Sequence, residues 1–160
     1  MTLSYRARGC GCLAAGLFGL WGCAGRPLFQ RGKAAVENIS ADIPGERFKA
    51  LATIAGNDGR TDLRMSADVR LVLTEAGFTA VPRAGRWETE QIAVADICAT
   101  RGSGVDGVLV VTYRSLKLID CVTSKTAYEI IHDPEAGGPG IRGLAQRLIR
   151  YLRGETKAKG

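Results

Sequence analysis

The sequence has only one histidine, His132, and 5 cysteines, and these shortages exclude several kinds of site. A site that needs two imidazoles is impossible, and no CxxC pair is present to build a structural zinc site. The glycine-rich stretches at 56–59 and 137–140 lack the lysine spacing of a P-loop and the full dinucleotide fingerprint. We therefore interpret both stretches as turns, and we expect no metal and no cofactor.

No hydrophobic run is long enough for a lasting membrane span. The apolar run at the amino end covers Leu13 to Gly22, whereas a helix that crosses a bilayer takes about 20 residues. Hydrophobic residues make up 46% and charged residues 24% of the 160 positions, which is close to average globular usage. Collagen-like, disordered and multi-span membrane classes are excluded, and the length fits one ordinary domain.

Residues 1–22 have the organisation of a signal peptide. Arg6 and Arg8 come first, no acidic residue is present, and the apolar run follows. Removing this segment leaves 20 basic against 16 acidic residues, which lowers the net charge from +6 to +4. A mildly positive exported domain is an ordinary soluble one, so we expect no nucleic-acid partner.

The run ends in Leu20-Trp21-Gly22-Cys23, which resembles the lipobox of bacterial lipoproteins. The resemblance implies that the thiol of Cys23 carries a diacylglyceryl group, that cleavage exposes its amine, and that acyl chains anchor the protein to a membrane. Ala24 at the next position implies the outer membrane, facing the periplasm. Ordinary secretion with cleavage elsewhere and an uncleaved interfacial helix are the alternatives.

Cys98 and Cys121 remain as the cysteines of the mature domain. Export into an oxidising compartment permits a disulfide between them. The alternative is that both are small buried apolar residues, because the sequence does not give the short Cα separation that a bridge requires.

The chain beyond the leader divides into a lipidated cysteine with a flexible tether at 23–46, an α/β domain at 47–153 and a tail at 154–160. Periodicity and turn residues predict a small mixed four-stranded sheet with helices packed on it, in the order strand-helix-strand-helix-strand-strand-helix. The first strands run parallel, and a hairpin adds an antiparallel edge. The predicted strands cover 48–55, 78–81, 105–119 and 126–131, and the predicted helices cover 61–77, 88–101 and 141–152.

This order, with the stretches 104–113 and 118–125, resembles small periplasmic lipoprotein domains of the curli-secretion lipoprotein, the penicillin-binding-protein activators and the amino-terminal domain of the Tol-system propeller protein. Gly104-Val105-Asp106 corresponds to the "alanine-aspartate-hydrophobic" strand of those domains, and Ser124 stands where their hairpin has glycine. The resemblance implies an envelope lipoprotein that docks on other proteins.

The loop at 82–87 is the preferred docking candidate, because Arg83, Arg86 and Trp87 are residue types that dominate protein-binding hot spots. The alternative is that Trp87 joins the second helix to the sheet while the arginines lie in water. Four arginines lie along the last helix, namely Arg142, Arg147, Arg150 and Arg153. They suit either an anionic partner or a solvated helix face. His132 is expected at a strand end in contact with solvent.

These features predict a membrane-anchored periplasmic lipoprotein that acts as a protein-binding accessory or assembly factor and is not an enzyme. The alternatives are a module that binds cell wall or lipopolysaccharide, and a cysteine-dependent envelope enzyme that uses Cys98 or Cys121.

Overall fold

The computed structural model describes residues 35–57, 61, 63–85, 87–100, 104–137 and 139–156. The predicted leader, the predicted lipidation site Cys23 and Arg86 lie outside these residues. The described strands are β1 (Ala35–Ile39), β2 (Ala50–Ala55), β3 (Thr79–Pro82), β4 (Gly107–Val111), β5 (Ser115–Asp120) and β6 (Thr126–His132), and the α-helices are α1 (Leu63–Glu75), α2 (Glu90–Ala99) and α3 (Ile141–Leu152).

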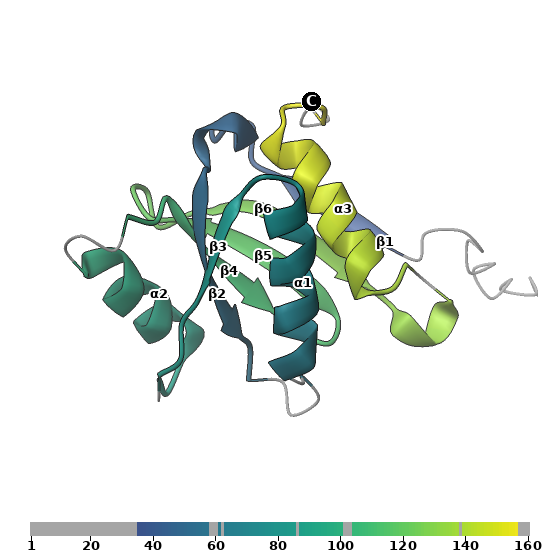
Figure 1. The fold of residues 1–160 in the computed structure, drawn as a ribbon, viewed down its shortest axis with the longest axis horizontal. Helices are drawn as coiled ribbons and strands as arrows, with labels where there is room; N and C mark the ends of the chain where they lie inside the picture. The colour runs from purple at the N-terminus through teal and green to yellow at the C-terminus, as the bar shows by residue number, and fades with distance from the viewer. Residues whose placement is uncertain are drawn as a thin grey trace, which may run out of the picture. The chain divides into compact units, whose positions relative to one another are not determined.

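The strands form one mixed sheet in the order β1-β6-β5-β4-β2-β3. β2 pairs in parallel with β3 and β4, while β4, β5, β6 and β1 pair antiparallel. α1 and α3 lie side by side on one face, and α2 lies on the other (Figure 1). Each face therefore has its own hydrophobic cluster, and β4, which is buried at all five positions, runs between them.

The predicted mixed α/β class, the parallel first strands and the antiparallel hairpin region are confirmed. The predicted number of four strands is wrong, because the sheet has six. One additional strand, β1, lies inside the expected tether, where Ala35 to Ile39 pair with His132 to Tyr128. Ile43 and Phe48, which follow β1 in the sequence, are also buried. The second half of the tether at 23–46 is therefore part of the folded domain.

The other additional strand comes from a reversal inside the single strand expected at 105–119. The Thr112 hydroxyl accepts hydrogen bonds from the amides of Arg114 and Ser115 at 3.2 and 2.8 Å. The amide of Thr112 donates to the carbonyl of Ser115 at 2.9 Å. A hydroxyl that satisfies backbone donors makes this turn without glycine or proline.

Two of the helices, α1 and α3, end at a glycine. Gly77, with φ of 91°, ends α1, since its amide donates to Thr74 and the amide of Phe78 donates to Leu73. Gly154, with φ of 72°, ends α3 in the same way. These pairs of bonds are Schellman motifs, in which the left-handed residue is glycine because it has no Cβ. Among the described residues, no helix is long and apolar enough to cross a membrane.

Candidate functional site

The carboxyl ends of the three parallel strands β2, β3 and β4 meet at one edge of the sheet. The chain passes from β2 through α1 to β3, and from β3 back across β2 through α2 to β4, so these two helices lie on opposite faces. In open α/β sheets this reversal of strand order leaves a crevice at the carboxyl edge, where ligands bind. The fold therefore directs attention to the segments that follow β2 and β3.

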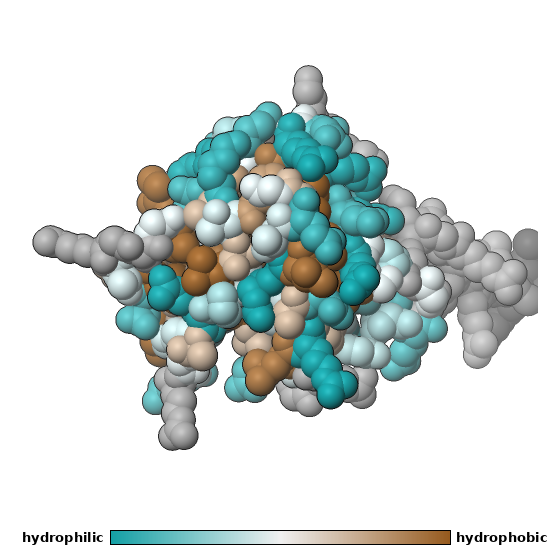
Figure 2. All heavy atoms as spheres, viewed as in Figure 1, coloured by the Kyte–Doolittle hydropathy of each residue, from teal (hydrophilic) through white to brown (hydrophobic). Residues whose placement is uncertain are grey.

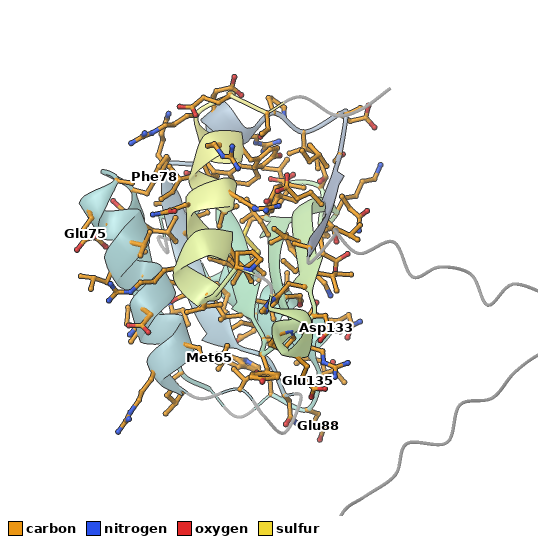
Figure 3. The ribbon with its side chains drawn as sticks, turned by 90° about the vertical axis from the view of Figure 1, so that its right-hand side faces the viewer. Met65, Glu75, Phe78, Glu88, Asp133 and Glu135 are labelled. Carbon is orange, nitrogen blue, oxygen red and sulfur yellow. A yellow bond between two sulfur atoms is a disulfide. The ribbon has the colours of Figure 1, made fainter. Side chains whose placement is uncertain are left out.

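A groove of about 380 Å³ occupies this edge, and we call it the carboxyl-edge groove. It is lined by Ile54, Ala55, Gly56, Asn57, Leu63, Arg83, Ala84, Gly85, Trp87, Glu88, Thr89, Glu90, Ala93 and Val110. Ile54, Ala93 and Val110 belong to the hydrophobic cluster under α2. Figure 3 shows Glu88 at the lower end of the molecule, which is also the end where α1 begins near Met65. The groove thus combines an apolar floor with charged and aromatic walls.

Arg83 continues the edge of the sheet beyond β3. Its amide donates to the carbonyl of Thr53 at 3.0 Å, which extends the pairing between β2 and β3 by one residue. The side chain is half-buried, and its Nε is buried without a hydrogen-bond partner among the described residues. A buried donor without a partner costs free energy. Arg83 therefore does not lie freely in water.

Trp87 joins the loop to α2. Its indole Nε1 donates to the Asp96 carboxylate at 3.0 Å, and the half-buried ring packs against the cluster under α2. Gly85 lies directly against this ring, and a Cβ at that position would collide with it. The alternative that Trp87 joins the second helix to the sheet therefore describes its contacts, while the ring also lines the groove.

Both ends of α2 are attached to the sheet. Thr89 caps the helix by accepting from the amide of Ile92, and Glu90 forms an ion pair with Lys117 of β5 at 2.9 Å. At the other end Cys98 forms a disulfide with Cys121, whose Cα atoms are 5.2 Å apart. The groove wall made by the amino end of α2 is consequently held in place rather than free to rearrange.

The same disulfide bears on chemistry. Because both sulfur atoms are bonded to each other, neither presents the thiolate that a cysteine nucleophile needs. His132 lies at the end of β6 as expected, but its predicted contact with solvent is wrong, since it is 7% exposed and its Nε2 lies 3.0 Å from the carbonyl oxygen of Tyr113. The described part of the chain contains no group of three acidic, histidine or cysteine side chains placed to hold a metal.

The structure thus brings Arg83 and Trp87 together in one groove and leaves Arg86 undescribed. Gly56 and Asn57, which sequence reasoning assigned only to a turn, line the same groove. Gly56 is required there by close packing, since a Cβ would lie 2.6 Å from the Thr112 methyl group. The sequence held a signal for this grouping. The segments 56–57 and 82–87 each follow a strand that is predicted to be parallel, and the carboxyl ends of parallel strands meet at one edge of a sheet.

No protein-family model matches the chain, and no curated protein matches it. Among solved structures it is similar to a PelC dodecamer from Paraburkholderia phytofirmans, with 12% identity and a TM-score of 0.40, over 79% of this chain and 98% of that chain. A single-substitution variant of that PelC dodecamer gives 14% identity and a TM-score of 0.42, over 78% of this chain and 98% of the other. Similarity at this level assigns no family.

Proposed function

We propose that this protein is a lipid-anchored, periplasm-facing protein of the outer membrane that works as a binding accessory or assembly factor for another envelope protein. The observation that carries the proposal is Leu20-Trp21-Gly22-Cys23 at the end of the apolar run. This sequence supplies an acceptor thiol at the point where a signal peptide ends. No turnover is part of the proposed function.

The Cys98–Cys121 disulfide supports an exported location. Structural disulfides persist in oxidising compartments such as the periplasm and are rare where glutathione keeps thiols reduced. This bridge joins α2 to the end of β5, and its two cysteines are 23 positions apart in the sequence. A bridge between elements of the core suits a domain that functions outside the cytoplasm.

The anchor and the folded domain are close together in the chain. Only residues 24–34 separate Cys23 from β1, and even a fully extended segment of that length reaches no more than about 40 Å. A domain held so near the bilayer meets partners in the membrane or cell wall at a raised effective concentration. Modest affinity at a docking surface is then sufficient for function.

The carboxyl-edge groove is the docking surface that we favour. Its arginine, its indole and its apolar floor are of the types that dominate binding hot spots, and attachment of α2 at both ends keeps the surface preformed. A preformed surface loses little conformational entropy when a partner binds. Its walls carry the charged residues Arg83, Glu88 and Glu90, which favour a partner with charged groups of both signs.

The anchor is tested by a Cys23→Ser variant beside a Cys12→Ser control. We expect Cys23→Ser to leave the membrane fraction and to lose metabolic labelling with palmitate, whereas Cys12→Ser behaves like the parent chain. The control matters because Cys12 precedes the apolar run. Unchanged fractionation and labelling of Cys23→Ser would contradict the lipid anchor.

The docking surface is tested with a photo-crosslinking amino acid at Ala84 beside a matched control at Ala67. Both alanines are exposed, but Ala84 lines the carboxyl-edge groove and Ala67 lies on α1. We expect one discrete adduct with an envelope protein from position 84 in living cells and none from position 67. Equal adducts from both positions, or none from either, would contradict the assignment of this surface.

A further inference from the structure

A second groove, which we call the arginine groove, runs between α1 and α3 on the opposite face of the sheet from α2. Its volume is about 610 Å³. It is lined by Val72, Glu75, Ala76, Pro139, Gly143, Gln146, Arg147, Ile149, Arg150 and Arg153. Figure 2 views this face and shows mainly hydrophilic residues, with smaller hydrophobic areas among them. The groove thus has apolar residues along it and guanidinium groups beside them.

Positive charge is concentrated along this side of the molecule. From residue 136 to 154 the sequence contains Arg142, Arg147, Arg150 and Arg153 and no acidic residue. Glu75 on α1, labelled in Figure 3, is the one carboxylate among the groove residues. With Glu37, which pairs with Arg147, three arginines face two carboxylates, so the groove keeps a net positive charge that attracts anions.

Two of the arginines are held in position by the fold. Nη1 of Arg147 donates to Glu37 of β1 at 3.0 Å, and Nη2 of Arg153 donates to the carbonyl of Ala76, at the end of α1, at 3.3 Å. Arg150, between them, is exposed, and its guanidinium group has no hydrogen bond or ion pair within the described ranges. Guanidinium groups keep several donors in a planar fork, so held arginines still pair with incoming carboxylates.

The ends of this chain do not complement the groove. Residues 1–34 contain five basic and no acidic side chains, and residues 157–160 contain Lys157 and Lys159 and no acidic side chain. Like charges in contact repel. Neither of these two segments therefore supplies acidic side chains to the groove.

We propose that the arginine groove binds an acidic, amphipathic segment of a partner protein, whose carboxylates pair with Arg147, Arg150 and Arg153 while its apolar side chains contact Val72, Ala76 and Ile149. Basic residues of the helix are all arginine, the residue suited to bidentate pairing with carboxylates. Helix-lined grooves of this kind accept segments with one apolar face. This site goes beyond the proposed docking at the carboxyl-edge groove and lies on the other face of the sheet.

The test uses the full chain in detergent micelles and a fluorescein-labelled amphipathic peptide made of glutamate and leucine at helical spacing. A peptide with glutamine at every glutamate position is the matched probe. We expect Arg150→Glu to weaken binding of the glutamate peptide by about tenfold, and Arg150→Gln by a smaller factor. Arg114→Glu is the control, because Arg114 is also exposed and its replacement alters the net charge equally.

The site is supported if Arg150→Glu weakens binding of the glutamate peptide while Arg114→Glu changes that binding by less than about twofold. Equal loss in both variants, or equal binding of the glutamine peptide, would overturn it in favour of a nonspecific charge effect. Binding to phosphatidylglycerol vesicles without binding to the peptide would overturn it in favour of a lipid surface. Sedimentation that reveals self-association dependent on Arg150 would overturn it in favour of a second copy.

Discussion

The carboxylate of Asp120, which has no exposed surface, lies 3.0 Å from the Nη2 atom of Arg47. Asp120 ends β5, and its Oδ2 also accepts hydrogen bonds from the amide and the hydroxyl of Thr123 at 2.9 and 2.6 Å. Arg47 lies in the segment between β1 and β2. One buried carboxylate therefore closes the β5–β6 turn and ties it to the amino-terminal part of the domain.

We expect Asp120→Asn to lower the free energy of unfolding by about 2 kcal/mol, since the amide keeps the shape but loses the charged acceptor that Arg47 and Thr123 require. Urea titration measures the loss. Asp42→Asn is the matched control, because Asp42 is exposed, and its effect should stay within about 0.5 kcal/mol. Similar effects of the two substitutions would show that the buried contacts carry no special stability.

The same carboxylate gives a pH dependence. Burial raises the pKa of Asp120, but hydrogen bonds from Thr123 and Val122 and the charge of Arg47 outweigh it, so the pKa lies below the ordinary value. A lowered folded-state pKa contributes stability above the unfolded-state pKa of about 3.9, and this contribution is lost as the pH falls through the folded-state value. The difference in unfolding free energy between the parent chain and Asp120→Asn should therefore be constant near neutrality and shrink below about pH 4. A difference that grows on acidification would contradict the assigned sign.

Local patterns predicted the three helices and the parallel first strands, but two strands required information that is not local. β1 alternates partly buried and exposed residues over only Ala35 to Ile39, and its partner β6 lies far along the chain. The turn after β4 depends on the hydroxyl of Thr112 rather than on glycine or proline. Short polar strands and turns made by side-chain hydroxyls have weak sequence signals.

The residues of the candidate site were likewise only partly predictable from the sequence. Arg83 and Trp87 were recognisable as hot-spot types in one loop, whereas Gly56 and Asn57 join them only because parallel strands end at one edge. The sequence did not decide whether Cys98 and Cys121 form a disulfide. Their Cα atoms, 23 positions apart in the sequence, approach to 5.2 Å only because α2 packs on the sheet. Spatial proximity between elements was the missing information in both cases.

Ser124 gives a prediction about the β5–β6 hairpin. Its φ of 56° makes it the one described non-glycine residue in the left-handed region. We expect Ser124→Gly to raise the free energy of unfolding by about 0.5 kcal/mol, because relief of backbone strain exceeds the added entropy of the unfolded chain. Ser40→Gly, at a position with negative φ, should instead lower it. Thermal unfolding of both variants checks the opposite signs, and a loss in both would contradict the strain argument.

The disulfide gives the last prediction, because it holds the end of α2 that is farther from the carboxyl-edge groove. Closing a loop of this length restricts the unfolded chain, so replacing both Cys98 and Cys121 with alanine should lower the free energy of unfolding by about 3 kcal/mol. Glu90 at the amino end of α2 keeps its ion pair with Lys117, and the indole of Trp87 keeps its hydrogen bond to Asp96, so the environment of the indole should change little. In the chain that begins at Cys23, Trp87 is the only tryptophan, so its fluorescence reports on the groove while denaturant titration reports on stability. Dithiothreitol should destabilise the parent chain and leave the double variant unaffected. A large shift of Trp87 emission in the folded double variant would show that the disulfide, rather than the contacts at the amino end of α2, positions the groove.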